Sequence, residues 1–223
     1  MVTSILLARK LGDKYSVYYK KNQHLSSFQF EALIGLMLGD VFAERNKPTH
    51  NTRLNFEQSQ SEHESYLLFL YSIFKNLVGT APKSPKRKPH SITGKTYSSL
   101  AFKTLAFPFL NIFHELFYGT AATRVKSIPQ NISDYFTAIS FAFWIMDDGM
   151  KSNEGLKLCT DSFQYSDILI LTKMLKTKFN IDCKPQKREV DCWRIYIPKS
   201  QMVIVRDLVK YHMHPDMLYK IGL

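Results

Sequence analysis

Cysteine is scarce in this chain of 223 residues. The three cysteines, Cys159, Cys183 and Cys192, are odd in number, contain no C-x-x-C pair and lie in the last third of the sequence. A disulfide framework needs paired cysteines and a zinc finger needs closely spaced ligand pairs, so neither is indicated. The composition therefore fits a reducing compartment best.

Long apolar runs and low-complexity stretches are also missing. A membrane-spanning helix needs about 20 consecutive apolar residues, and no segment reaches that length without a charge or a polar cluster. Nine glycines and nine prolines exclude fibrous and low-complexity classes. With 45% hydrophobic and 22% charged residues, the chain has the composition of a folded globular protein, long enough for one large domain or two small ones.

Acidic residues are few relative to basic ones. The chain has 30 Lys and Arg against 19 Asp and Glu, which gives a formal net charge of +11. An excess of this size predicts a polyanionic partner, either nucleic acid or an anionic membrane surface. Because no membrane span is predicted, we expect nucleic acid as the partner and no membrane.

The N-terminal segment 1–27 carries five basic residues against one acid, together with three tyrosines. We interpret it as a docking arm, and a targeting segment is the alternative.

One internal repeat organises the rest of the chain. Residues 28–40 form an apolar run that follows two serines suited to capping a helix and ends in Gly39-Asp40. Residues 137–149 form a second such run, which opens on Thr137 and ends in Asp147-Asp148-Gly149. Both runs are apolar on every face, and a helix of this kind must be buried on all sides.

The segments after each apolar helix also match in order. A polar turn, an extended stretch and a helix at 64–77 follow the first helix, and the second is followed by the equivalent stretch and a helix at 167–179. A basic extended region comes next in each half, at 82–104 and 184–198, before closing helices at 107–117 and 201–211. This order predicts an α+β fold of two αββαββα repeats, 28–130 and 131–223, with antiparallel sheets related by a pseudo-twofold axis.

The two apolar helices are expected to pack against each other on that axis. Small residues on both would let their backbones approach closely, and this brings Asp40 and Asp148 together at one end. Two neighbouring carboxylates repel unless divalent cations lie between them, and hard oxygen ligands favour magnesium. The alternative is a pair of ordinary helix C-terminal turns with solvated acids, although the helix dipole opposes an acid at that end. The small residues are Ala32, Gly35, Gly39, Ala138, Ser140 and Ala142.

These helix ends resemble the two motifs of monomeric LAGLIDADG homing endonucleases. The first motif reads Leu33-Ile34-Gly35-Leu36-Met37-Leu38-Gly39-Asp40, and the second reads Phe141-Ala142-Phe143-Trp144-Ile145-Met146-Asp147-Asp148-Gly149. Each repeat ends in a lysine-bearing segment, Lys126-Ser127-Ile128-Pro129 and Met217-Leu218-Tyr219-Lys220. The context is similar to the branch that contains the mitochondrial omega-intron endonuclease. Val41, Phe143 and Met146 depart from the motif but leave both final acids intact.

The resemblance implies a catalytic centre. Asp40 and Asp148 would hold divalent metals at the two scissile phosphates, with the backbone carbonyls of Gly39 and Asp147 as further ligands. Lys126 and Lys220 would assist the attacking water and stabilise the charged phosphate, and a generic phosphate contact is the alternative for both. We expect Mg²⁺ as cofactor, with Mn²⁺ as a substitute and Ca²⁺ binding without supporting cleavage.

The basic stretches are expected to form a saddle for DNA. Segment 80–126 has eight Lys and Arg against one acid, and segment 173–210 has ten against four. Antiparallel strands that are apolar on one face and basic on the other fit the major groove, and most basic side chains would contact phosphate. The candidates are Arg45, Lys47, Arg53, Lys86, Arg87, Lys88, Lys151, Lys184, Lys187, Arg188 and Arg194.

The resemblance predicts a monomeric, intron-encoded enzyme that hydrolyses both strands of a long, nearly non-palindromic DNA site and leaves short 3′ overhangs. The alternative is an intron RNA maturase, or another non-cleaving nucleic-acid-binding descendant of the fold. Both acids and both lysines are present, which favours the enzyme, because a protein that only binds RNA has no need of paired buried acids. An organelle-encoded protein is expected, mitochondrial before chloroplast.

Overall fold

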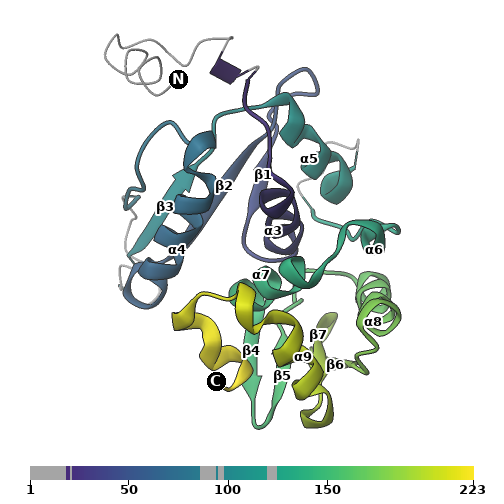
Figure 1. The fold of residues 1–223 in the computed structure, drawn as a ribbon. Coiled ribbons are helices and arrows are strands. Elements are labelled where there is room, and N and C mark those ends of the chain that lie inside the picture. Colours follow the sequence, from purple (N-terminus) through teal and green to yellow (C-terminus); the bar gives the residue numbers. More distant parts are fainter. Residues whose placement is uncertain (1–18, 21, 86–93, 95–97, 120–124) are drawn as a thin grey trace.

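The computed structural model describes residues 19–20, 22–85, 94, 98–119 and 125–223. Two antiparallel sheets lie on either side of a central helix pair, α3 (Ser27–Leu38) and α7 (Ala138–Asp148), as Figure 1 shows. Lys86, Arg87 and Lys88 and most of the predicted arm 1–27 lie outside the described residues. In that described part, no helix has the length and apolar character needed to cross a membrane.

Each sheet is flanked by helices from its own repeat. The strands are β1 (Phe42–Glu44), β2 (Arg53–Ser59), β3 (Ser99–Lys103), β4 (Gly149–Ser152), β5 (Gly155–Leu158), β6 (Lys184–Glu189) and β7 (Cys192–Ile197). The other α-helices of the described residues are α4 (Gln60–Phe74), α5 (Asn111–Tyr118), α6 (Ile132–Tyr135), α8 (Tyr165–Phe179) and α9 (Met202–Val209). Short 3-10 helices span Lys75–Leu77, Pro108–Leu110, Lys199–Gln201, Lys210–His212 and Pro215–Ile221.

The strand order corresponds between the two sheets, but in the described residues the first has three strands and the second has the predicted four. The first has the order β1-β2-β3 and the second β4-β5-β7-β6, and all neighbouring strands are antiparallel. Lys83 forms an isolated bridge to Ala101 of β3, at the position that β6 occupies beside β7. The predicted α+β fold with two antiparallel sheets is therefore confirmed.

The central helices begin where the sequence predicts. Ser26 accepts a hydrogen bond from the amide of Gln29 and the Gln29 side chain accepts one from the amide of Ser26, which completes a capping box. Thr137 caps α7 by accepting from the amide of Ser140. These caps satisfy amide groups that have no partner within the helix.

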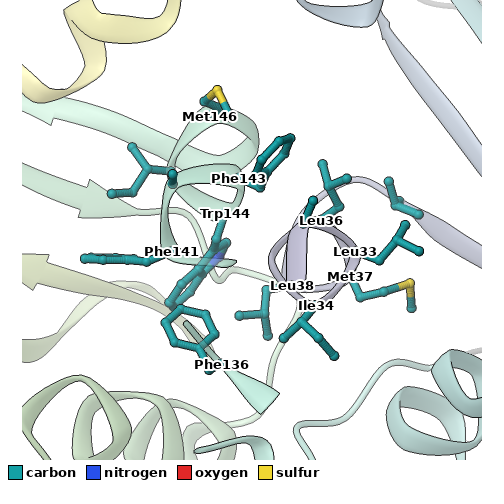
Figure 2. Packing of buried hydrophobic residues seen from close by; sticks show 14 of the residues in the cluster. Leu33, Ile34, Leu36, Met37, Leu38, Phe136, Phe141, Phe143, Trp144 and Met146 are labelled. Atoms are coloured by element: carbon teal, nitrogen blue, oxygen red, sulfur yellow. The ribbon is translucent and has the colours of Figure 1, made fainter. Parts of the chain in front are cut away.

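The α3–α7 contact lies at the centre of the core. A Cβ atom added to Gly35 would lie 2.0 Å from the carbonyl oxygen of Ser140, so the two backbones approach as closely as glycine allows. Ser140 also donates to the carbonyl of Glu31 on the facing helix at 2.7 Å. Figure 2 shows Phe143 and Trp144 of α7 directed into the core beside the leucines of α3, where all these side chains are fully buried.

Four helices depart from their predicted bounds. The helix predicted at 167–179 begins at Tyr165, and the one predicted at 201–211 is α-helical over Met202–Val209 with a 3-10 turn on either side. The helix predicted at 64–77 begins at Gln60, bends at His63 and ends as the 3-10 turn Lys75–Leu77. The helix predicted at 107–117 starts with the 3-10 turn Pro108–Leu110 and becomes α-helical at Asn111, since proline is suited to the first turn of a helix.

Candidate active site at the paired helix ends

The ends of α3 and α7 meet, but they end differently. The α3 helix stops at Leu38, and the amides of Gly39 and Val41 both bond to the carbonyl of Leu36, at 3.1 and 3.2 Å. The α7 helix continues through Asp148, and its end is closed by the amide of Gly149 bonding to Ile145. The amide of Asp40 instead donates to Oδ2 of Asp147 at 3.1 Å, so the two acid-bearing ends are in direct contact.

Two of the three acids here, Asp147 and Asp148, are partly buried, and their pKa values are shifted upward. Burial raises the pKa of Asp147 to about 7 and that of Asp148 to about 8, and the charge of Asp40 adds to both shifts. Asp40 itself is exposed. The raised pKa values show that ionised carboxylates are unfavourable in this poorly solvated place. A bound divalent cation would stabilise their charged form.

Both predicted lysines reach this acid group. Nζ of Lys126 donates to the carbonyl of Gly39 at 2.6 Å, and Nζ of Lys220 donates to the carbonyls of Met146 and Asp147 at 2.5 and 3.0 Å. Burial lowers the pKa of Lys126 to about 8 and also lowers that of Lys220, while the three aspartates oppose the shift. The structure thus brings Asp40, Asp148, Lys126 and Lys220 together in pseudo-symmetric places.

Each lysine-bearing segment is held by the opposite repeat. The amide of Ile128, two residues after Lys126, donates to Oδ1 of Asp167 on α8 at 3.2 Å. Asp216, four residues before Lys220, accepts from Ser65 on α4. The position of each ammonium therefore depends on contacts made across the pseudo-twofold axis.

The oxygen donors at the helix ends fit a hard divalent cation. Asp40 and Asp148 supply carboxylates, and the carbonyls of Gly39 and Asp147 can still coordinate, because a carbonyl oxygen has two lone pairs and each lysine uses one. Among the described residues, no three His, Cys, Asp or Glu side chains converge as a ready metal cage. A cation here would therefore take only part of its coordination from side chains.

Three side chains at the site, those of Gln58, Tyr66 and Asp147, were not predicted from the sequence to have a role there. Gln58 on β2 donates through Nε2 to Oδ2 of Asp40 at 3.0 Å, and the buried Tyr66 on α4 donates its hydroxyl to Oδ1 of Asp147 at 2.8 Å. The side chain of Asp147, predicted only as the source of a carbonyl ligand, is the third. Gln58 could have been identified from the sequence, because it continues the alternation of Leu54 and Phe56 and so places a polar side chain on the apolar face of the strand.

One face of each sheet is covered by the core and the other, which we call the open face, is not. In the first sheet the open face carries Arg53 and Lys103, with Lys83 aligned beside Ala101. In the second sheet the strand register aligns Lys157 with Tyr196 and Lys184, and Arg194 lies two residues before Tyr196. Because side chains alternate along a strand, these basic residues lie on the same face of their sheet.

The other predicted DNA contacts fall in several places. Arg45 and Lys47 line a hollow of about 790 Å³ on the open face of the first sheet. Lys151 pairs with the buried Leu156, and Lys187 lies with Nζ 5.9 Å from the ring centre of Trp193, so the register places both on the opposite face from Lys157. That placement separates Lys151 and Lys187 from the other candidates.

Four of the predicted arginines are ion-paired within the protein. Arg53 binds Glu44, Arg194 and Arg188 share Asp161, and Arg45 binds Glu115. The Arg53 guanidinium lowers the pKa of Glu44 to about 2, and Arg194 lowers the pKa of Asp161. A guanidinium has five N–H donors, so each arginine keeps donors for another acceptor. Arg188 lies at a bulge in β6, which lets it reach the same acid as Arg194.

The fold and the site define a class: two α+β repeats in one chain, with packed central helices whose ends carry acids beside lysines that bond to backbone carbonyls. The profile of the LAGLIDADG DNA endonuclease family matches residues 30–205, and the chain belongs to this family.

Known relatives match the chain along most of its length. It is 33% identical over 215 residues to the cytochrome b mRNA maturase bI2 of Debaryomyces hansenii, covering 96% of this chain and 80% of that protein. It is 30% identical over 217 residues to the probable intron-encoded endonuclease 1 of Wickerhamomyces canadensis, covering 92% and 88%. Among solved structures, the homing endonuclease I-WcaI bound to its DNA recognition sequence matches with a TM-score of 0.84 and 27% identity over 96% of each chain.

Proposed function

We propose that this protein is an intron-encoded homing endonuclease that cuts both strands of a specific DNA site with the help of divalent cations. The observation that carries the proposal is the contact between the two helix ends that bear Asp40 and Asp148, with a lysine donating to a backbone carbonyl at each end. The likeness to the DNA-bound I-WcaI and to the Wickerhamomyces canadensis protein supports it.

The open faces of the two sheets are the proposed DNA surface. They carry basic side chains in both repeats, and strands of this kind fit the major groove. Because one chain supplies both acids, a monomer suffices for double-strand cleavage. The two open faces differ in sequence, so we expect a long and nearly non-palindromic target.

The proposed mechanism assigns one acid to each scissile phosphate. Mg²⁺ held by Asp40 and Asp148 would lower the pKa of water and neutralise charge that develops on phosphate, and Mn²⁺ should substitute. Lys126 and Lys220 are anchored on backbone carbonyls beside the acids, so each can donate to a phosphate oxygen without a large movement. Fixed ammonium groups in a poorly solvated site stabilise such charge more strongly than they would in water.

A plasmid that carries the uninterrupted host allele tests the proposal. Purified protein with Mg²⁺ should linearise it, Ca²⁺ should support binding without cleavage, and Asp40→Asn and Asp148→Asn should abolish double-strand cleavage with DNA affinity retained. Failure of the wild-type protein to cut this allele with either Mg²⁺ or Mn²⁺ would remove the main support for the enzyme.

An intron RNA maturase is the second candidate, because a relative that covers 96% of the chain carries that name. This function needs RNA binding but not the paired acids, so splicing of the host intron should survive Asp40→Asn if the protein acts as a maturase. The same relative is named for cytochrome b mRNA, and we therefore place the protein in mitochondria before chloroplasts. A tagged copy followed by microscopy checks this placement.

A further inference from the structure

The two catalytic acids are supported differently by the backbone. Asp148 is the last residue of α7 and its carbonyl also accepts from Cys159 at 2.9 Å, so it is fixed by the helix and the sheet. Asp40 lies two residues beyond the end of α3, and its amide finds its acceptor on the other repeat. The backbone of Asp40 is therefore held by a side chain of the other repeat, whereas that of Asp148 is held by backbone hydrogen bonds.

That side chain belongs to Asp147, whose two carboxyl oxygens are both engaged. Oδ2 accepts from the amide of Asp40 at 3.1 Å and Oδ1 accepts from the hydroxyl of Tyr66 at 2.8 Å. Tyr66 is 0% exposed and comes from α4, which packs on the first sheet. The carboxyl thus links the end of α7 to two elements of the first repeat.

Gly39 leaves the space that the side chain of Asp147 occupies. Gly39 and Asp147 each precede a catalytic acid and face each other across the pseudo-twofold axis. A Cβ atom at residue 39 would lie 2.5 Å from Cβ and 2.6 Å from Oδ2 of Asp147. Only one of the two positions can bear a side chain, and the glycine is in the repeat whose acid needs support.

We propose that Asp147, oriented by Tyr66, is a positioning residue that holds the backbone of Asp40 by accepting its amide hydrogen bond. The inference rests on the proposed nuclease function for its effect on cleavage, but the hydrogen bond itself exists without DNA or metal. The role depends on an acceptor at one oxygen and a partner for Tyr66 at the other, and it does not require the charge.

Two substitutions, Asp147→Asn and Asp147→Ala, distinguish a role of Asp147 as hydrogen-bond acceptor from a role of its negative charge. In Asp147→Asn the amide oxygen can accept from Asp40 and the NH₂ group can donate to the Tyr66 oxygen, so the link is kept. In Asp147→Ala both contacts are lost. We expect cleavage by Asp147→Asn to stay within about threefold of wild type and cleavage by Asp147→Ala to fall about 10- to 100-fold, as misplacement of a reacting group does.

Amide hydrogen exchange at Asp40, measured by NMR without DNA or metal, reports directly on the hydrogen bond from this amide to Asp147. We expect exchange to speed up about tenfold or more in Asp147→Ala, to stay near wild type in Asp147→Asn and to be intermediate in Tyr66→Phe. Tyr71→Phe is the matched control, since Tyr71 is on the same helix with its ring against Phe102.

Loss of cleavage in Asp147→Asn equal to that in the alanine variant would overturn the proposal and assign the role to the charge. Unchanged Asp40 exchange in Tyr66→Phe and Asp147→Ala would overturn it as well. If Asp147→Ala does not fold, the asparagine and Tyr66 variants still decide. A wild-type protein that cuts no DNA would contradict the proposed function and leave the exchange measurement as the test of the positioning role.

Discussion

The acids at the helix ends make the stability of this protein depend on pH in an unusual direction. Most carboxyls in folded proteins are stabilised in the charged form, as Glu44 is by Arg53. Asp147 and Asp148 instead have folded pKa values of about 7 and about 8, above the ordinary value of 3.8. In the folded protein they keep protons that the unfolded chain has already released.

From this we predict that the metal-free protein becomes less stable as the pH rises from 6.5 to 8. In this range the folded state binds more protons than the unfolded state, so the free energy of unfolding falls by up to about 1.4 kcal/mol per pH unit for each titrating group. Burial lowers the pKa of His63 and His114 from 6.5, and these groups act in the opposite direction below that value. Above pH 8 the lowered pKa of Lys126 should make stability rise again.

Thermal unfolding in chelator at several pH values checks this dependence. Asp148→Asn should flatten the curve between pH 6.5 and 8, and Mg²⁺ should stabilise the wild-type protein most near pH 8, where the carboxylates are ionised. A melting temperature that increases from pH 6.5 to 8 in chelator would contradict the assigned shifts.

At the scale of helices, the close packing of α3 on α7 sets the positions of both acids. Alanine in place of glycine inside a helix normally stabilises it by about 1 kcal/mol. At Gly35 the added Cβ would lie 2.0 Å from the Ser140 carbonyl oxygen, so the helices must separate. The usual sign of the substitution should therefore be reversed.

Gly35→Ala is predicted to destabilise the protein by about 1–3 kcal/mol, the range for overpacked cores, and to reduce cleavage because the acid-bearing ends shift. Ser72→Ala is the control, since it also creates a helical alanine but at an exposed position on α4. Chemical denaturation of both variants gives the comparison. A Gly35→Ala protein that is more stable than wild type would show that the helices tolerate a wider separation.

The two central helices and their acids could be predicted from the sequence because the signals for them are local. Ser26 and Thr137 cap the two apolar runs, and Asp40 and Asp148 lie at the ends of these runs. The contact from Tyr66 to Asp147 joins residues 81 positions apart and depends on how α4 packs, which periodicity does not specify. The sequence therefore predicts which residues form the centre but not the bond that orients it.

The DNA surface also could not be predicted fully from the sequence, because the sequence does not show on which face of a sheet each basic residue lies. Composition alone identified Lys151 and Lys187 as candidates, but the register places them on the opposite face from Lys157 and Arg194. A shift of one residue along a strand exchanges its two faces, so assignment to a face needs the strand pairing. Lys157 and Lys103 could have been identified from the alternation with Leu156, Leu158 and Phe102, once the strand ends were known.

Over the whole molecule, the net charge of +11 should act on DNA mainly through the open faces. Binding to phosphates releases counterions, so affinity should fall steeply between about 50 and 200 mM salt. Ion pairs such as Glu44 with Arg53 and Asp161 with Arg194 neutralise part of these faces. Lys157 has no ion pair within the part of the chain that the structure describes, whereas Lys103 lies 3.7 Å from Glu44, so the two lysines should contribute unequally.

The open-face assignment can be tested by the salt dependence of binding in Ca²⁺, where cleavage does not interfere. Lys157→Gln should weaken binding and lower the slope of log Kd against log salt by about 1, as loss of one phosphate contact does. Lys103→Gln should lower it by less, because Glu44 already offsets part of that charge. Lys151→Gln and Lys187→Gln remove the same charge from the opposite face, so both should leave the slope at the wild-type value. Equal effects of all four substitutions would mean that net charge alone attracts the DNA, and an effect confined to Lys151 and Lys187 would place the DNA on the other side of the second sheet.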